Sequence, residues 1–246
     1  MGYTATEITN SDLANLTTIS QYDIIFLNCG SRKYSISQAL FPAIDANLAT
    51  FVANGGSIYA SDWDVAYLVG GTDNTSSCSP AGGFVPDSKL CSVNQGYPGI
   101  VPAVVSNAGL SSALGFSTLN IDFDLGSWQK ITNYDPNYWE VLVKDNSNNA
   151  LMLRTNHFTT TGTPTTPIGN APTTTFVTVC ITVGNTQISI SVPQVLVPYL
   201  VALGATVGPC SGSSTSGYIY YTSFHNHATG NIGNAGVILQ YVILNL

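Results

Sequence analysis

Charged side chains are scarce in this chain of 246 residues, because Asp, Glu, Lys and Arg together make up only 8% of it. A typical soluble protein has about a quarter. Six of the charged residues are basic and 13 are acidic, which gives a formal net charge of -7. Binding to nucleic acid requires clustered Lys and Arg to neutralise phosphates, and binding to an anionic membrane surface requires them too. The composition therefore argues against both kinds of partner.

Long apolar runs and closely spaced cysteine pairs are also missing. No uninterrupted apolar stretch approaches the roughly 18 residues of a membrane-spanning helix, so we expect no membrane span. No two cysteines are separated by two residues, which argues against a zinc-ribbon or thioredoxin-like site. Hydrophobic residues nevertheless make up 44% of the chain, and that is enough for a folded core at this length.

Hydroxyl and amide side chains take the place of charge on the expected surface. Two tracts, residues 159–167 and 211–217, consist almost entirely of Ser, Thr, Gly and Pro. Such tracts are typical of exposed linkers or loops, and they are compatible with glycosylated extracellular segments. We therefore expect an extracellular or cell-surface protein, which is compatible with being one module of a longer chain.

The five cysteines fit an oxidising compartment. Cys78 and Cys91 bracket a loop rich in Gly and Pro, and a bridge between them would stabilise the fold by roughly 3 kcal/mol. Cys180 and Cys210 are the second predicted pair, which leaves Cys29 as the odd thiol. The alternative is that all five are reduced, buried cysteines.

The apolar pattern predicts an α/β fold. Residues 22–28 form an apolar run typical of a buried strand, 36–54 have apolar positions at helical spacing, 57–60 form a second buried strand and 65–69 a second helix. This β-α-β-α order is typical of a parallel, doubly wound sheet. A further strand is expected over 217–224.

The rest of the chain is predicted to elaborate this single α/β domain of residues 1–246. Residues 70–99 are rich in Gly, Ser and Pro and are expected to form a loop insertion that contains the first disulfide. Residues 100–210 are expected to be rich in strands, with a hairpin that turns at 184–185. Residues 237–246 are apolar at helical spacing and are predicted to pack on the sheet as the last helix.

Unusual side chains follow three of the predicted strands. Asn28 ends the first strand, Ser61, Asp62, Trp63 and Asp64 follow the second, and His225 and His227 follow the late strand. Ligands of open α/β sheets bind at the carboxyl ends of strands, where the loops converge. The sequence therefore places the candidate site at this edge of the sheet.

Two blocks of sequence resemble the class I glutamine amidotransferase-like superfamily. Residues 22–27 and 51–62, with a helix between them, look like its first half, and residues 218–225 are similar to its late strand. The ThuA-like (trehalose-utilisation) branch is the nearest, since its last strand also ends in an aromatic-Thr/Ser-His pattern. The resemblance implies a flavodoxin-like sheet.

The resemblance also implies a degenerate catalytic triad. The family's elbow cysteine falls on Asp62, its histidine on His225 and its glutamate on His227. A carboxylate cannot attack glutamine as a thiolate does, so we expect no glutamine hydrolysis.

Three interpretations of this cluster remain open. In the first, a retired active site serves as a binding cleft, in which Asp62 caps the following helix. Its ligand-binding candidates are Trp63, Asp64, Asn28 and His227. In the second, a hydrolase uses Ser61 or Asp62 with His225 as base or acid. In the third, His225, His227 and Asp62 hold a divalent metal, because a His-x-His pair at a strand end has both rings on one face.

The sequence thus predicts a secreted or cell-surface interaction module that binds carbohydrate or another polymer. A secreted hydrolase, with or without a metal, is the first alternative. A structural subunit of a surface filament or layer is the second, and exposed apolar surface in the β-rich region would favour it. Buried Ser61 and Asp62 side chains, hydrogen-bonded to the backbone, would favour the interaction module over the hydrolase.

Overall fold

A computed structural model describes most of the chain. The described residues are 4–29, 37–70, 83–124, 126–156, 176–183, 186–207 and 216–224, together with 236, 238, 241 and 242 in the last helix; within strands β3, β9 and β10, the side chains of 91–93, 176–178, 182–183, 186–191 and 193 are not described. The chain divides into two compact units. The first unit comprises residues 1–162 and 217–246, and the second unit comprises residues 163–216.

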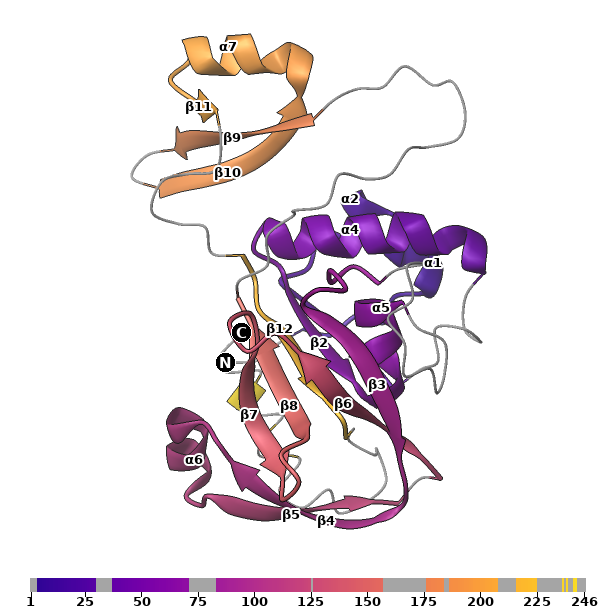
Figure 1. The fold of residues 1–246 in the computed structure, drawn as a ribbon. Helices are drawn as coiled ribbons and strands as arrows, with labels where there is room; N and C mark the ends of the chain where they lie inside the picture. Colours follow the sequence, from indigo (N-terminus) through magenta and orange to yellow (C-terminus); the bar gives the residue numbers. More distant parts are fainter. Residues whose placement is uncertain are drawn as a thin grey trace. The chain divides into compact units, whose positions relative to one another are not determined.

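The first unit is built on a mixed sheet with a parallel part. Strands β1 (Ile24–Asn28), β2 (Ser57–Ser61) and β12 (Ile219–Thr222) are neighbours and run parallel (Figure 1). Helix α4 (Phe41–Ala53), preceded by the 3-10 turn η1 (Gln38–Leu40), connects β1 to β2. The β-α-β order and the position of the late strand beside β2 are both as the sequence predicts.

Antiparallel strands complete this sheet on the other side of β12. The order from β12 is β8 (Ala150–Thr155), β7 (Glu140–Asp145), β4 (Gly99–Val105) and β5 (Thr118–Phe123). Strand β6 (Trp128–Tyr134) pairs with β3 (Leu90–Gly96) and touches β8. β3 lies in the segment that the sequence predicts as a loop, and it owes its pairing to β6 rather than to any apolar pattern of its own.

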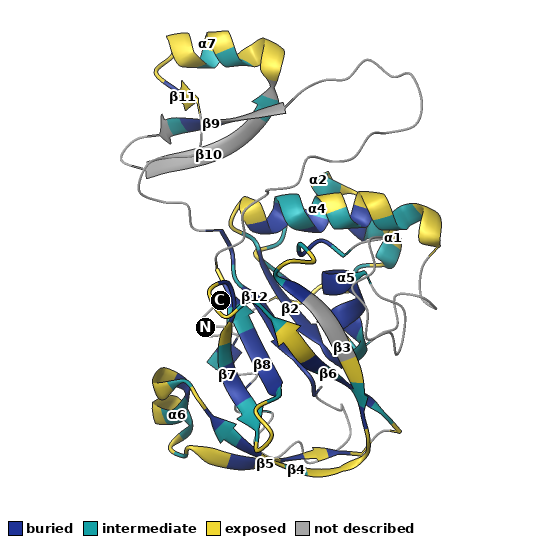
Figure 2. Ribbon diagram, in the orientation of Figure 1, coloured by how far each residue is buried: buried dark blue, intermediate teal, exposed yellow. Residues whose placement is uncertain are grey.

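Helices cover both faces of the sheet. One core contains α1 (Asn10–Leu13), α2 (Leu16–Ile19), α4 and α5 (Val65–Val69), whose apolar side chains pack on alternate residues of β1, β2 and β12. The other core contains Leu110 of α6 (Ala108–Leu114), together with Ile238 and Val242 of the last helix. Every residue of β2 and β12 is therefore buried (Figure 2), which explains why the centres of these strands, residues 58–60 and 219–221, are continuously apolar or aromatic.

One glycine sets the distance between β12 and the end of α4. Gly217 donates its backbone N–H to Val52 O, and a Cβ atom at Gly217 would lie 1.9 Å from the carbonyl oxygen of Gly56. Only glycine permits this approach, so the start of β12 is fixed against the turn that leads into β2.

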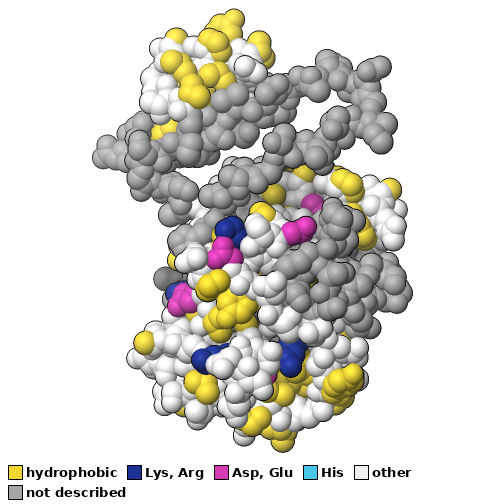
Figure 3. Space-filling view, in the orientation of Figure 1, with side chains coloured by type: hydrophobic (Ala, Val, Ile, Leu, Met, Phe, Trp, Pro, Cys, Tyr) yellow, Lys and Arg dark blue, Asp and Glu magenta, His cyan; other side chains and the backbone are white. Residues whose placement is uncertain are grey.

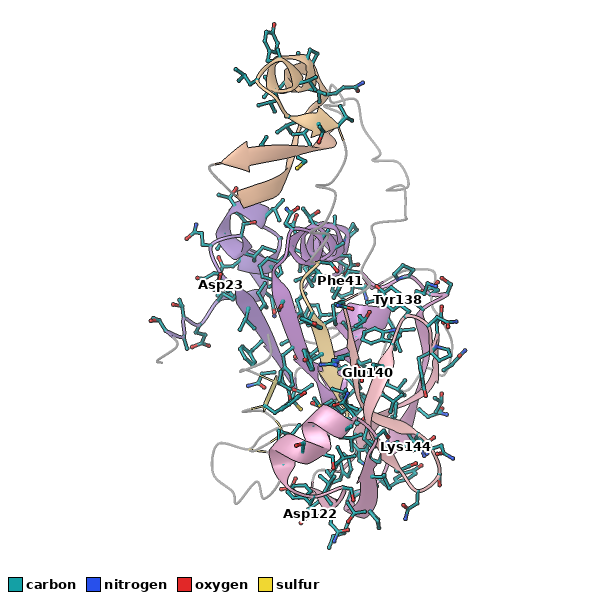
Figure 4. All side chains as sticks on the ribbon, turned by 90° about the vertical axis from the view of Figure 1, so that its left-hand side faces the viewer. Asp23, Phe41, Asp122, Tyr138, Glu140 and Lys144 are labelled. Atoms are coloured by element: carbon teal, nitrogen blue, oxygen red, sulfur yellow. The ribbon has the colours of Figure 1, made fainter. Side chains whose placement is uncertain are left out.

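Aromatic and acidic side chains of the β-rich region have ordinary structural positions. Trp128, Tyr138 and Trp139 belong to the two cores. Asp122 is exposed on β5 (Figure 4), where the alternating pattern of this strand predicts it. Glu140 on β7 accepts a hydrogen bond of 2.6 Å from Nε of Arg154 on β8, so these two charges form an ion pair.

The second unit is a three-stranded antiparallel sheet with one helix. Its strands lie in the order β10 (Thr186–Pro193), β9 (Phe176–Val183) and β11 (Thr206–Val207). The turn η3 (Gln194–Leu196) leads into α7 (Val197–Ala202), which contacts β9 and β11. The predicted hairpin of residues 176–192 is present as β9 and β10.

The described helices are all short. The longest, α4, has 13 residues, and none of the described helices has the length and apolar character to cross a bilayer.

Candidate functional site

The three parallel strands end side by side, and this edge holds the candidate site. Asn28 at the end of β1 pairs in register with Ser61 at the end of β2, and Ser61 pairs with Thr222 at the end of β12. The chain therefore leaves β12 toward Phe224 at the same edge at which it leaves β2 toward Asp62. This is the juxtaposition on which the sequence-based site depends.

Two residues at this edge have a strained backbone. Cys29, directly after β1, has a φ of 46°, and Asp62, directly after β2, has a φ of 48°. Among the described residues only one other non-glycine residue, Asn148 in the β7–β8 turn, has a positive φ. Left-handed conformations of non-glycine residues are uncommon, and they cluster at functional sites because the surrounding structure must hold them in place.

The carboxylate of Asp62 is completely buried and hydrogen-bonded. Its exposed fraction is 0%. Oδ1 accepts a hydrogen bond of 2.7 Å from the backbone N–H of Gln129 on β6, and Oδ2 lies 3.6 Å from Sγ of Cys29, which donates to it. Asp62 thus ties the ends of β1 and β2 to β6.

The sequence-based interpretation of Asp62 as a helix cap is wrong. Asp62 is itself the first residue of the 3-10 turn η2 (Asp62–Asp64), and the N-cap positions of η2 and α5 are Ser61 and Asp64. Neither cap residue makes a side-chain capping hydrogen bond. The carboxylate of Asp62 instead accepts hydrogen bonds from the Gln129 N–H on β6 and from the Cys29 thiol after β1.

Tyr221 on β12 closes the cluster from the third strand. Its hydroxyl contacts the backbone carbonyls of Gln129, at 3.1 Å, and Asp62, at 3.3 Å, and can donate to either. Complete burial, and then the nearby carboxylate of Asp62, raise the pKa of Tyr221 well above its ordinary value. Tyr221 therefore stays neutral and serves as a hydrogen-bond donor at any physiological pH.

Cys29 is a free, half-buried thiol with a suppressed acidity. Burial raises the pKa of the Cys29 thiol to about 12, and the neighbouring Asp62 carboxylate adds to this effect by its charge and by accepting the thiol hydrogen bond. Since the thiolate is the reactive form of cysteine, Cys29 is poorly suited to act as a nucleophile in this arrangement.

The other predicted side chains of this edge differ in accessibility. Ser61 is fully buried, and its hydroxyl donates a long hydrogen bond of 3.5 Å to Leu27 O. Asp64 is also buried. Asn28 is exposed and Trp63 is partly exposed, with the indole N–H donating to Ser127 O at 3.4 Å. The side chains that can meet a ligand at this edge are therefore Asn28 and Trp63 rather than the acids.

Several predicted residues lie outside the described part of the chain. His225 and His227 are among them, so the hydrolase and metal interpretations that use them stay predictions. Among the described residues, no three His, Cys, Asp or Glu side chains gather in a group that could hold a metal ion. Cys180 is disulfide-bonded, but the side chains of Cys78, Cys91 and Cys210 are not described, so both disulfide pairings also stay predictions.

Two members of the cluster, Gln129 and Tyr221, are not predicted as site residues from the sequence. Tyr221 carries a usable signal, since it lies in the late strand that the sequence places beside Asp62. Gln129 carries none, because its contribution is a backbone N–H and carbonyl supplied by β6, which no pattern links to β2. The described structure thus defines an α/β protein with a buried polar cluster at the carboxyl edge of three parallel strands.

Comparisons of the chain with protein-family models, with curated proteins and with solved structures found no match. The resemblance to the amidotransferase-like superfamily therefore stays a prediction.

Proposed function

We propose that this chain is a secreted or cell-surface interaction module in which a degenerate amidotransferase-like site serves binding and structure instead of catalysis. The observation that carries the proposal is the burial of Asp62. Its carboxylate has no exposed surface and is hydrogen-bonded to the backbone of Gln129 and to the thiol of Cys29. A nucleophile or a general acid must reach the substrate directly or through one water molecule. The Asp62 carboxylate, which has no exposed surface, can contact neither a substrate nor a solvent water molecule.

The local geometry supports the proposed family relationship. In the amidotransferase-like superfamily the elbow residue follows a strand and precedes a helix, and Asp62 directly follows β2 as the first residue of the η2–α5 segment, with a φ of 48°. The adjacent parallel strands β1, β2 and β12 and the helix α4 agree with a flavodoxin-like sheet. In this proposal, the strained elbow persists while the nucleophile has been exchanged for a residue that holds three strands together.

A carbohydrate or a similar neutral polymer fits the accessible part of the edge. Asn28 presents an amide that can both donate and accept hydrogen bonds, and the partly exposed indole of Trp63 offers an apolar ring face. β1 and η2, which carry these residues, are in contact. An exposed amide and an apolar ring face on two contacting elements suit a ligand with hydroxyl groups and C–H faces, and they require no charge on either partner.

Binding to a panel of soluble and insoluble polysaccharides tests the proposal. We expect the full chain to bind at least one of them, and Asn28→Ala to weaken that binding by about tenfold, the effect of losing roughly 1.4 kcal/mol of hydrogen bonding. Asn54→Ala is the matched control, because Asn54 is an exposed asparagine at the end of α4, before the start of β2 and therefore at the opposite edge of the parallel strands. Equal weakening by both variants, or no binding to any polysaccharide, would contradict the proposed ligand.

The hydrolase alternative makes an opposite prediction in a second assay. If Asp62 or Ser61 were catalytic, the full chain would hydrolyse ester or glycoside test substrates, and Asp62→Asn would abolish this activity with little change in thermal stability. We expect no activity that depends on Asp62, and we expect Asp62→Asn to be detected through stability alone.

A further inference from the structure

The second unit contains no charged residue. Residues 163–216 include no Asp, Glu, Lys, Arg or His, and the chain carries no Asp, Glu, Lys or Arg at all after Arg154. The net charge of -7 therefore belongs entirely to residues 1–154. A surface without charge cannot use ion pairs to select a partner, and it does not repel an identical surface.

Large apolar side chains are exposed on the helical side of this unit. Leu196, Tyr199 and Leu203 recur at intervals of three and four residues, so they lie on one stripe of the η3–α7 segment. Tyr199 is 69% exposed and Leu203 is 84% exposed, and Val195, Val201 and Val207 are exposed elsewhere on η3, α7 and β11. Figure 3 shows yellow apolar side chains gathered on α7, with no charged side chain among them. A grouped set of this kind indicates an interaction site, unlike single exposed apolar residues.

Strand β10 gives this unit a second feature suited to association. It is an edge strand, since among the described strands it pairs only with β9. Its sequence, Thr186–Pro193, has no charged residue, and its one proline is the last residue. Soluble proteins commonly protect edge strands with charged side chains or internal prolines, and β10 has neither.

From these observations we propose that the second unit is a self-association surface, and that the occupant of the exposed η3–α7 face is the same face of a second copy of this chain. A charged protein partner would find no complementary charge here. A membrane surface is a poor fit because the face has no Lys or Arg to meet anionic headgroups. A second copy brings an equally uncharged apolar face, and a two-fold axis lets the same residues serve both partners. The proposal does not depend on the site at Asp62.

Sedimentation velocity of the full chain between about 1 and about 300 µM tests the proposal, because association follows mass action. We expect the average mass to rise with concentration toward that of a dimer. The double variant Tyr199→Glu/Leu203→Glu places like charges on both faces and is expected to raise the dissociation constant at least about tenfold. Its matched control is Tyr97→Glu/Ile100→Glu, which changes two residues of the first unit with similar exposure, 73% and 66%, and is expected to leave the dissociation constant unchanged.

Three results would overturn the proposal. A wild-type mass independent of concentration over this range would mean that this face has no second copy as its occupant. An equal effect of both double variants would mean that generic surface charge, not this face, controls association. Co-sedimentation with uncharged phosphatidylcholine vesicles that Tyr199→Glu/Leu203→Glu abolishes, without self-association, would assign the face to lipid. Far-UV circular dichroism of each variant confirms that it is folded, and Leu203→Ser offers a milder change if the double variant does not fold.

Discussion

The strained conformation of Asp62 predicts an unusual order of stabilities for substitutions at this position. Asp62→Ala removes the acceptor of the buried Gln129 N–H, which costs about 2 kcal/mol, and places alanine in the left-handed region, which costs about 1 kcal/mol more. Asp62→Gly also loses the acceptor but relieves the backbone strain, so we expect a total loss of about 1 to 2 kcal/mol. Asp62→Asn keeps an acceptor and tolerates a positive φ, and its loss should be about 1 kcal/mol or less.

Urea unfolding followed by tryptophan fluorescence measures these differences in the relevant part of the chain. All three tryptophans, Trp63, Trp128 and Trp139, belong to the first unit, so the signal reports the unit that contains Asp62. Asp122→Ala is the matched control, since Asp122 is exposed on β5, and it should change the free energy of unfolding by no more than about 0.5 kcal/mol.

The relative stabilities of the Asp62→Gly and Asp62→Ala variants test whether the backbone at position 62 is strained. At an ordinary strand or helix position alanine is the more stable residue by roughly 0.5 to 1 kcal/mol, whereas here glycine should be the more stable. If Asp62→Gly proves as destabilising as Asp62→Ala, the strain at this elbow is not significant. If Asp62→Asn proves as destabilising as Asp62→Ala, the hydrogen bond to Gln129 is not what makes Asp62 matter.

Two further predictions follow from the pKa values of buried groups. At pH 8 the native Cys29 thiol should react with iodoacetamide about a thousandfold more slowly than the same thiol in unfolded protein, because its pKa rises from 9.0 to about 12. Asp62→Asn should accelerate this reaction. A native thiol that reacts as fast as the unfolded one would contradict the Cys29–Asp62 contact. Burial raises the pKa of Tyr59 to about 12 and that of Tyr221 well above its ordinary value. Because the folded pKa values exceed those of the unfolded chain, the stability from these neutral tyrosines is complete below about pH 10 and is lost as the pH rises from about 10 to about 12, by up to roughly 1.4 kcal/mol per pH unit for each tyrosine. Urea titrations at pH 9, 10 and 11 measure this loss, and an unchanged midpoint at pH 11 would contradict it.

The parallel part of the sheet is predictable from the sequence because its strands have continuous apolar centres. Residues 24–27 and 58–60 are apolar runs on either side of a helix with clear periodicity, and 218–221 is an aromatic run. β2 and β12 are buried on both faces as this pattern indicates, whereas Phe26 and Asn28 of β1 are exposed, so the expectation of a fully buried first strand is wrong. Their parallel order then fixes which residues meet at the carboxyl edge, so the neighbourhood of Ser61 and Thr222 follows from elementary sheet geometry.

The polar cluster itself could not be derived in this way. The contacts of Asp62 depend on a positive φ and on β6, whose register against β3 is irregular at Leu90 and Ser92. Helix capping, the commoner role of an aspartate after a strand, was therefore the wrong prediction. Pairing between β3 and β6 is decided by long-range contacts that leave no periodic signal in either segment.

The segregation of charge gives the two units different sensitivities to the medium. Changes of ionic strength screen the charged side chains of residues 1–154 and do not act on residues 163–216, which carry no charge. Sulfate and warming strengthen contacts between apolar faces, and cold weakens them. Ionic strength is therefore expected to change the electrostatics of the first unit alone, whereas temperature and excluded solutes change how strongly the uncharged faces of two copies associate.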